Sequence, residues 1–434
     1  MNHLRRTALI PLALALLLGC GRRKDGAVTS RADGGPAASS SAGPVTSGSS
    51  APSAVPPASS ASAVPLEPES PAPLPASFLG ARSEKACKAQ TIELATYQLR
   101  GDVGLGGRAD GVAAAWRVRL GGKPQDQVAF AAYDQEGKPA ARARGVGLTQ
   151  QDVPPRVFAS GSEWTVAWFD EKGLVYTRPR VEPLPAPEIA HLGAIAPDVA
   201  ADVALAASRD GILATTPSGP GRAQIGVFVF SRPDSAMVSV LGVTHHGIEP
   251  HRSAVAASHD PHVGSTFVVW DEGGALVGSR FDAAGKENDA PCTLAPAGEK
   301  RERLALAATA TGAVAMWMEG GHVRTRALDA TGCPASPIWT VAEGRWATIA
   351  SLGDTAIVAW VAADGRLLAV RLQPSGAPVA RGIDAGEGSS GVKDPPSVVA
   401  FGAGKVAFGW SEVMGPMIST KRLQARIVDG ACIP

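Results

Sequence analysis

The chain has 434 residues, of which 41 are Lys or Arg and 40 are Asp or Glu, so its formal net charge is +1 at neutral pH. Charges of both signs are mixed along the chain, which argues against a nucleic acid or an anionic lipid surface as partner. Hydrophobic residues make up 45% of the chain, and five cysteines occur.

The N-terminus has the pattern of a targeting segment. Arg5 and Arg6 are followed by an apolar run over 8–18 that is too short to span a bilayer. The run ends in Leu17-Leu18-Gly19-Cys20, which resembles the lipobox of bacterial lipoproteins. An ordinary secretory signal cleaved nearby is the alternative.

The lipobox resemblance implies a signal peptide over 1–19 and acyl chains, such as palmitate, on Cys20 as the mature N-terminus. More than one acyl chain gives stable membrane anchoring. By the same resemblance, Gly21 in place of an acidic residue indicates the outer membrane. We therefore expect an outer-membrane lipoprotein of the cell envelope that faces the periplasm or the cell surface.

The remaining cysteines support export. Lipidation of Cys20 leaves Cys87, Cys292, Cys333 and Cys432, an even number in an oxidising compartment. No Cys-x-x-Cys or Cys/His zinc spacing joins them, so disulfides are expected rather than free thiols.

Residues 20–80 are predicted to form a disordered tether. From about 26 to 80 the chain is dominated by Ala, Ser, Pro and Gly, with no charge between Asp33 and Glu67. Such a segment buries too little apolar surface to offset the entropy of ordering. A flexible chain of this length spans roughly 40 Å on average. Residues 81–434 are then the folded body, which we expect to be a monomer.

The body is built from a repeat. Its clearest copy is a β-branched and aromatic strand ending in Trp270, a Gly-Gly turn, a second strand, and an Asp-x-x-Gly turn at 282–285. Tryptophans at the corresponding position recur at intervals of 43–52 residues, with one interval of 102 that spans two units. They are Trp116, Trp168, Trp270, Trp317, Trp360 and Trp410. The spacing gives seven units of about 49 residues, and periods of 40 to 50 residues are typical of propeller blades.

The predicted fold is therefore an all-β propeller of seven four-stranded blades, with six or eight blades as alternatives. Alanine-rich strands such as 253–257 precede the Trp strands and suit the crowded inner positions. The unit without a Trp, near 203–213, is the least regular. The aromatic residues, Asp and Gly of the repeat are interpreted as structural.

Ring closure is predicted from the two ends of the body. The last unit lacks a fourth strand, and a spare strand near 91–99 precedes the first unit, so the spare strand should complete the seventh blade. Cys87 would then lie close to Cys432, and a disulfide between them would lock the ring. Cys292 and Cys333 follow the Asp-x-x-Gly turns of consecutive units, which suggests a bridge between neighbouring blades.

Arginines recur late in the third strand of the units. We interpret them as outer-face packing or salt-bridging residues, with an anion site as the alternative. They are Arg178, Arg280, Arg326, Arg371 and Arg426.

No sequence motif of catalysis is present. The pattern looks like a bacterial β-propeller lipoprotein, but the motifs of sialidase-like, WD, kelch and quinoprotein propellers are absent. One histidine-rich stretch contains His245, His246, Glu249 and His251, and imidazole with carboxylate can bind a transition metal. His259 and His262 follow, but should lie at the opposite face. No catalytic residue and no other cofactor is predicted.

The predicted function is a tethered, non-enzymatic binding or scaffold module for a protein or glycan partner. Its ligand surface should be the face formed by the connections between blades, by analogy with the fold. The longer connections are expected at 145–155, 181–197, 243–252 and 382–395. A glycan-active hydrolase or lyase, and a metal-binding protein using 245–251, are the alternatives.

Overall fold

The computed structural model describes residues 89–433, with gaps. The chain divides into two units, Met1–Val64 and Pro65–Pro434, and every described residue belongs to the second. The gaps are 97–98, 122, 161, 180–188, 193–194, 196–199, 201, 208–211, 219–223, 231–238, 245–252, 258–265, 283–286, 288–289, 380–381, 390 and 415–420. Among the described residues, no helix has the length and apolar character needed to cross a bilayer.

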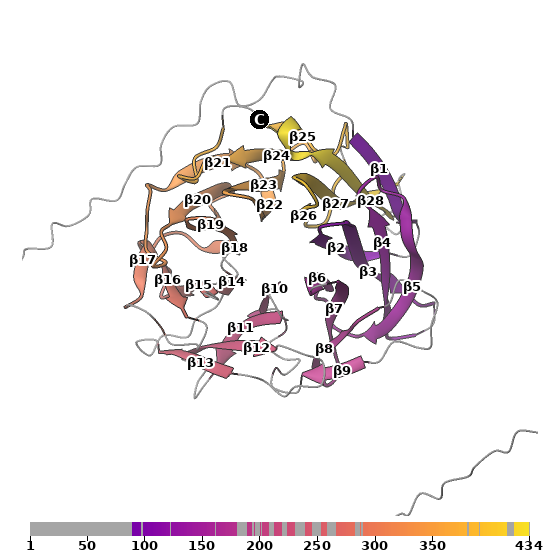
Figure 1. The fold of residues 1–434 in the computed structure, drawn as a ribbon, viewed down its shortest axis with the longest axis horizontal. Helices are drawn as coiled ribbons and strands as arrows, with labels where there is room; N and C mark the ends of the chain where they lie inside the picture. The colour runs from indigo at the N-terminus through magenta and orange to yellow at the C-terminus, as the bar shows by residue number, and fades with distance from the viewer. Residues whose placement is uncertain are drawn as a thin grey trace, which may run out of the picture. The chain divides into compact units, whose positions relative to one another are not determined.

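The body is a propeller of seven four-stranded antiparallel sheets, as predicted (Figure 1). Each sheet is one blade, and its first strand faces the axis of the ring. Blade 1 is β2 (Leu99–Arg108), β3 (Gly111–Arg119), β4 (Asp126–Asp134) and β5 (Pro139–Thr149). Blade 2 is β6 (Arg156–Ser160), β7 (Glu163–Asp170), β8 (Gly173–Thr177) and β9 (Ile189–Leu192). Blade 3 is β10 (Ala204–Ala207), β11 (Ile212–Ser218), β12 (Gln224–Phe230) and β13 (Ser239–Thr244).

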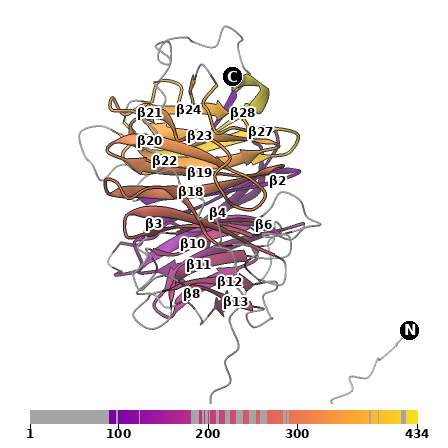
Figure 2. The same cartoon turned by 90° about the vertical axis from the view of Figure 1, so that its left-hand side faces the viewer.

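The second half of the ring repeats this order. Blade 4 is β14 (Ser253–Ala257), β15 (Thr266–Glu272), β16 (Ala275–Phe281) and β17 (Cys292–Ala295). Blade 5 is β18 (Arg301–Thr309), β19 (Gly312–Glu319), β20 (His322–Leu328) and β21 (Trp339–Glu343). Blade 6 is β22 (Arg345–Leu352), β23 (Thr355–Val361), β24 (Leu367–Leu372) and β25 (Ile383–Asp384). Figure 2 shows the ring from the side.

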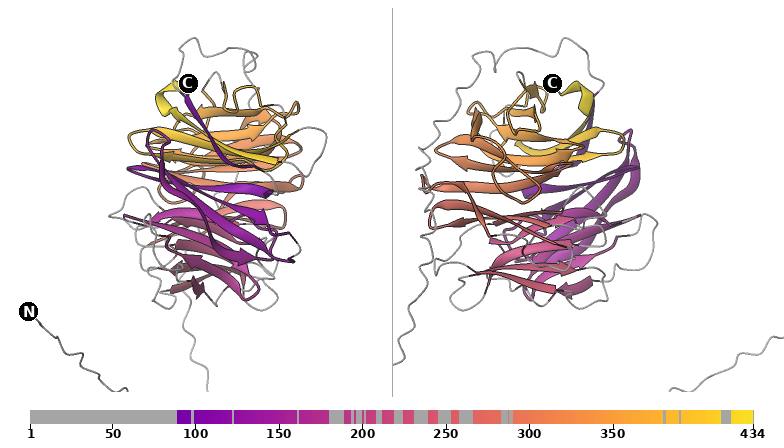
Figure 3. Two further views of the ribbon diagram at one scale, coloured as in Figure 1. Left: turned by 90° about the vertical axis from the view of Figure 1, so that its right-hand side faces the viewer. Right: turned by 60° about the vertical axis from the view of Figure 1, so that its left-hand side comes forward.

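The seventh blade joins the two ends of the body. It contains β26 (Ser397–Phe401), β27 (Lys405–Val413) and β28 (Lys421–Asp429), and its outer strand is β1 (Ala89–Thr96). β1 pairs antiparallel with β28, from Ala89 opposite Val428 to Thr96 opposite Arg422 (Figure 3). The prediction that an N-terminal strand completes the last blade is confirmed.

The two ends of the ring differ in the chain connections that lie there. Because every blade repeats the same strand order, all inner strands begin at one end, which receives the connections from the preceding blade. We call this the between-blade end. At the opposite end, which we call the turn end, the chain passes from the first strand of a blade to the second and, in blades 1 to 6, from the third to the fourth. The chain enters the ring at Ala89, which lies opposite Val428 near the close of β28 and therefore at the turn end.

The repeating tryptophans form the packing between blades. Trp270, Trp317, Trp360 and Trp410 are all fully buried, and each lies in the second strand of its blade. Burial of large aromatic surface is a main source of stability in such a core. Blade 3 has no tryptophan: Thr216, at the position in β11 that Trp270 holds in β15, is buried instead.

Three inner strands bulge directly opposite these tryptophans. The pairing register shifts between Arg100 and Gly104 in β2, between Glu302 and Ala305 in β18, and between Arg345 and Thr348 in β22. The second-strand residues skipped by the pairing are Trp116, Trp317 and Trp360. A β-bulge bends its strand and re-aims a side chain. Here it does so at the between-blade end of the axis.

Glycine allows blade 1 to approach its neighbours closely. A Cβ on Gly104 would lie 2.0 Å from the carbonyl oxygen of Pro155 in the connection to blade 2. A Cβ on Gly107 would lie 2.4 Å from the carbonyl oxygen of Ala400 in blade 7. Any larger residue at either position would force the inner strands apart.

Candidate functional site

Several predicted site residues lie outside the described residues. They are Cys20, Cys87, His245, His246, Glu249, His251, His259 and His262. Within the described ranges, no group of three or more His, Cys, Asp or Glu is placed to hold a metal ion. The metal site and the lipidated cysteine therefore stay predictions.

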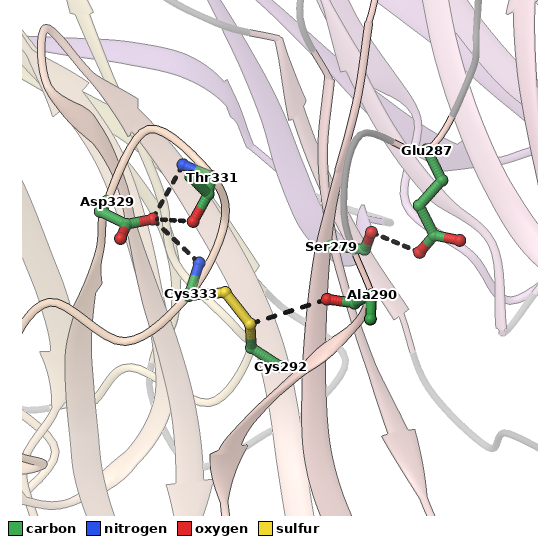
Figure 4. Close-up of a disulfide and its surroundings, with 7 residues drawn as sticks. All are labelled: Ser279, Glu287, Ala290, Cys292, Asp329, Thr331 and Cys333. Atoms are coloured by element: carbon green, nitrogen blue, oxygen red, sulfur yellow. Dashed lines mark hydrogen bonds between the residues drawn. A yellow bond between two sulfur atoms is a disulfide. The ribbon is translucent and has the colours of Figure 1, made fainter. Parts of the chain in front are cut away.

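A disulfide joins Cys292 and Cys333, with their Cα atoms 5.2 Å apart (Figure 4). Cys292 begins the outer strand of blade 4, and Cys333 follows the turn after β20 of blade 5, so the bond links neighbouring blades as expected. Asp329 shapes that turn by accepting hydrogen bonds from the backbone N–H of Thr331 (2.8 Å) and of Cys333 (3.1 Å).

Cys432 is also disulfide-bonded. Since Cys292 and Cys333 are bonded to each other, its partner is one of the two cysteines outside the described residues, Cys20 or Cys87. The predicted pairing with Cys87 is compatible with this bond, and the identity of the partner stays a prediction.

The recurring third-strand arginines have structural partners, in agreement with their interpretation. Arg280 of blade 4 donates to the carbonyl oxygen of Ala330 in blade 5 at 2.8 Å, and Arg326 of blade 5 donates back to that of Leu294. Arg426 of blade 7 donates to the carbonyl oxygen of Asp384 in blade 6 at 3.0 Å.

Two further members of this group are bound within their own blades. Arg178 pairs with Glu163 at 3.1 Å, and Arg371 donates to the Thr355 hydroxyl at 3.2 Å. These partners are structural: Arg280, Arg326 and Arg426 join neighbouring blades, and Arg178 and Arg371 form contacts within their own blades.

The predicted loops at the between-blade end need correction. The 181–197 stretch was expected to be one connection, but β9 (Ile189–Leu192) lies inside it because four blade strands must fit before β10. Similarly, β5 extends through 145–149, and β25 occupies 383–384. The described connections between blades are consequently shorter, such as 150–155 and 385–396.

Charged side chains from different blades gather where the inner strands begin. Asp102 lies in the bulge of β2, Arg156 begins β6, and Arg303 lies in the bulge of β18. Asp394 precedes β26. Asp102 interacts electrostatically with all three of the others, although their blades are distributed around the ring. We call Asp102, Arg156, Arg303 and Asp394 the axial cluster.

The axial cluster changes the acidity of its members. Burial raises the pKa of Asp102 to about 6, and the repulsion of Asp394 adds to this, while Arg303, Arg156 and Arg117 oppose it. Burial also lowers the pKa of Arg156, with Arg303 acting in the same direction and Asp102 against it. Arg156 is nevertheless exposed to solvent, so a ligand can reach its guanidinium although many protein atoms lie around it.

The two arginines of the cluster lack partners of their own. Among the described residues, no hydrogen bond and no ion pair within 4.0 Å involves Arg156 or Arg303. In contrast, Arg117 pairs with Asp152 at 2.8 Å and also donates to the carbonyl oxygen of Gln151. The axial arginines therefore remain available to a ligand.

Asp394 is held in place by residues of blade 7. Lys421 Nζ donates to its carboxylate at 2.6 Å, and the Ser411 hydroxyl donates to the same oxygen. These bonds use the Asp394 carboxylate for structure and leave Asp102 as the carboxyl group of the cluster that has no hydrogen-bond partner among the described residues.

Two residues in the bulges of the inner strands have a strained backbone conformation. Arg303 has φ 55° and Trp346 has φ 53°, both in the left-handed region that disfavours side chains, whereas Gly101 takes this conformation in the bulge of blade 1. Arg345 stacks over the Trp346 ring, 4.3 Å from its centroid. Non-glycine residues in strained conformations are found preferentially at binding and active sites.

No pattern in the sequence indicates the axial cluster. Its members are separated by 54, 147 and 91 residues along the chain, and no linear motif connects them. A weak signal is present in the arginines that begin inner strands, as in Arg301-Glu302-Arg303 and Arg345-Trp346. Only the ring closure brings blades 1 and 5 to opposite sides of one axis.

Comparisons with known proteins give no family. No protein-family model and no curated protein sequence matches the chain. Solved structures that match include a protein of unknown function from Dyadobacter fermentans, with 11% identity, a TM-score of 0.43, and coverage of 79% of this chain and 99% of that one. AofleA from Arthrobotrys oligospora matches with 12% identity, a TM-score of 0.43, and coverage of 72% and 93%. An α-L-arabinofuranosidase from Fusarium graminearum matches with 9% identity, a TM-score of 0.38, and coverage of 78% and 99%.

Proposed function

We propose that this protein is a lipid-anchored binding module of the cell envelope, and that its propeller engages a protein or glycan partner at the between-blade end. The observation that carries the proposal is the axial cluster. In it, Arg156 and Arg303 are close enough for their charges to interact, and neither has a hydrogen-bond or ion-pair partner among the described residues. Asp102 offsets their repulsion without a hydrogen bond or close ion pair to either one, so both guanidinium groups keep donors for a ligand. A ring needs no such arrangement in order to fold.

The direction of the ring favours this end as the binding surface. The chain enters the body at Ala89, at the turn end. A tether that joins the ring at Ala89 is attached at the turn end, so its point of attachment does not lie at the between-blade end. The proposed site of attachment is Cys20, through the lipobox resemblance.

In-cell cross-linking of the full-length chain tests the proposal. Membranes are isolated, the chain is recovered, and its cross-linked partners are identified by mass spectrometry. We expect one or two partners in near-stoichiometric amounts with the native sequence, and strongly reduced amounts with Arg156→Gln. Arg178→Gln, which removes a half-buried arginine of the rim, is the matched control and should retain the partners. Equal recovery with both variants would place the binding surface elsewhere.

A second candidate is a glycan-active hydrolase or lyase, which one observation favours. Glycoside hydrolysis requires two carboxyl groups, one of which has a raised pKa so that it can act as an acid. Asp102 has a pKa raised to about 6 and lies close enough to Asp394 for their charges to interact. Release of reducing sugar from a polysaccharide panel tests this candidate, and activity that Asp102→Asn abolishes would support it over simple binding.

A further inference from the structure

We propose that the axial cluster binds the carboxylate of an acidic saccharide between Arg156 and Arg303, and that acid strengthens this binding through Asp102. The inference rests on the proposed function, because it names the ligand chemistry of the same end of the ring. It is carried by the positions of three side chains at the between-blade end of the inner strands: Arg156 begins β6, and Asp102 and Arg303 lie in the bulges of β2 and β18.

The two arginines explain why the ligand should carry a carboxylate. A guanidinium is planar and always charged, and it matches a carboxylate with two parallel hydrogen bonds. Arg156 and Arg303 come from blades 2 and 5, so an anion between them is approached from two sides. The mutual repulsion of these guanidinium groups would be relieved by a bound negative charge.

Asp102 and Trp346 account for the saccharide. Asp102 adds a carboxyl group that can accept a hydrogen bond from a ligand hydroxyl or, when protonated, donate one. Trp346 occupies the bulge of β22 that corresponds to the bulge holding Arg303 in the neighbouring blade, and its half-buried ring carries the stacked guanidinium of Arg345 at the same end of the ring of blades. A ligand with one carboxylate and several hydroxyls fits this set better than the side chains of an acidic peptide, which carry carboxylates alone.

The pH dependence follows from the charges that face Asp102. These are Arg303 from β18, Asp394 before β26, Arg156 from β6 and Arg117 from β3. Asp394 and Arg117 are already paired with Lys421 and Asp152. When ionised, Asp102 repels an anionic ligand and competes for the two free arginines. Its pKa is raised to about 6, so this competition is absent at pH 5 and complete at pH 7.5.

Titration of the full-length chain in detergent tests the inference. The probes are D-glucuronate, the neutral sugar D-glucose, and a short oligoglutamate peptide, each followed by calorimetry at pH 5 and pH 7.5. We expect glucuronate to bind about ten- to thirty-fold more tightly at pH 5, as protonation of one group with a pKa near 6 predicts. Glucose should bind at least ten-fold more weakly than glucuronate at pH 5.

Three variants separate the roles of the residues. Arg156→Gln should weaken glucuronate binding at least ten-fold at both pH values, whereas Arg178→Gln should leave it unchanged. Asp102→Asn should bind equally well at both pH values, close to the affinity of the native chain at pH 5. The unfolding midpoints of all three variants establish that each remains folded.

Specific results would overturn the inference. They are glucose binding as tightly as glucuronate, tighter binding of oligoglutamate, no effect of pH, or no effect of Arg156→Gln. If these results were obtained while Arg156→Gln still abolished cross-linking in cells, only the ligand class would be wrong. Loss of both effects would also contradict the proposed function.

Discussion

At the scale of single residues, Asp102 links the stability of the body to pH. Its pKa is raised in the folded state, from 3.8 to about 6, so its contribution is most favourable below 3.8 and is lost as the pH rises through 6. The ionised carboxylate therefore destabilises the folded chain at neutral pH. It is kept at the axis despite this cost, which is consistent with a role in binding.

Asp102→Asn should consequently stabilise the protein. The amide keeps the size of the side chain and removes the ionisation, so the gain in unfolding free energy should be about 3 kcal/mol at pH 7.5 and only about 1 kcal/mol at pH 4.5. Urea unfolding at the two pH values measures it. Asp364→Asn is the control with the opposite sign, because hydrogen bonds within its turn lower the pKa of Asp364. A uniform gain at both pH values would exclude the ionisation of Asp102 as the cause.

Arg303 should show a conflict between stability and binding. Its φ of 55° costs a side chain energy that glycine does not incur, as Gly101 demonstrates in blade 1. Arg303→Gly should raise the unfolding free energy by about 0.5–1 kcal/mol at pH 5, where Asp102 is protonated, and weaken glucuronate binding at least ten-fold. Arg303→Lys keeps the positive charge and the strained φ at position 303, so it should not raise the unfolding free energy. A stability loss with Arg303→Gly would mean that the side chain supports the bulge.

At the scale of elements, β1 closes the ring and should be indispensable. Ile92 and Leu94 of β1 are buried against Ala425 and Ile427 of β28. Ile92→Ala removes buried apolar groups and leaves a cavity, so it should cost about 2–4 kcal/mol in urea unfolding. Thr91→Ala, at an exposed neighbouring position, should cost less than about 0.5 kcal/mol. Equal effects of the two changes would show that the edge of blade 7 is loosely packed.

The elements were predictable because the repeat is local and redundant. Six buried tryptophans mark second strands, and the fourth strand missing from the last unit indicated β1. The strand bounds in blade 3 and the extent of β5 were harder to predict. In blade 3, Thr216 replaces the tryptophan that marks the second strand, and the turn signals around β5 are weak. The axial cluster was not predictable, because it depends on bulges in β2 and β18 that no local pattern indicates.

At the scale of the whole molecule, the bond at Cys432 should matter more than the bond between blades 4 and 5. Cross-links stabilise by restricting the unfolded chain, and the effect grows with the length of the closed loop. Cys292 and Cys333 are 41 residues apart, whereas a link from Cys432 to Cys87 would enclose nearly the entire body.

Cys432→Ser should therefore lower the unfolding free energy by about 2 kcal/mol more than the Cys292→Ser Cys333→Ser double variant. Urea unfolding of both proteins measures the difference. Mass spectrometry of unreduced peptides identifies the partner, which we expect to be Cys87. A peptide containing Cys20 would instead exclude its lipidation and contradict the proposed anchor.

The proposed lipid anchor would attach the protein to a membrane through Cys20. A cysteine with at least two acyl chains stays bound to a bilayer. Cys20→Ala should move the protein from the membrane pellet to the soluble fraction, because the tether and the ring then lose their attachment. Its body should unfold at the same urea concentration and bind glucuronate with the same pH dependence, since the axial cluster lies at the end of the ring away from Ala89. Cys292→Ser, which removes a cysteine of the ring, should remain in the pellet. Retention of Cys20→Ala in the membrane fraction would mean that the ring itself holds a membrane partner, and that partner would then be the first target for cross-linking at the between-blade end.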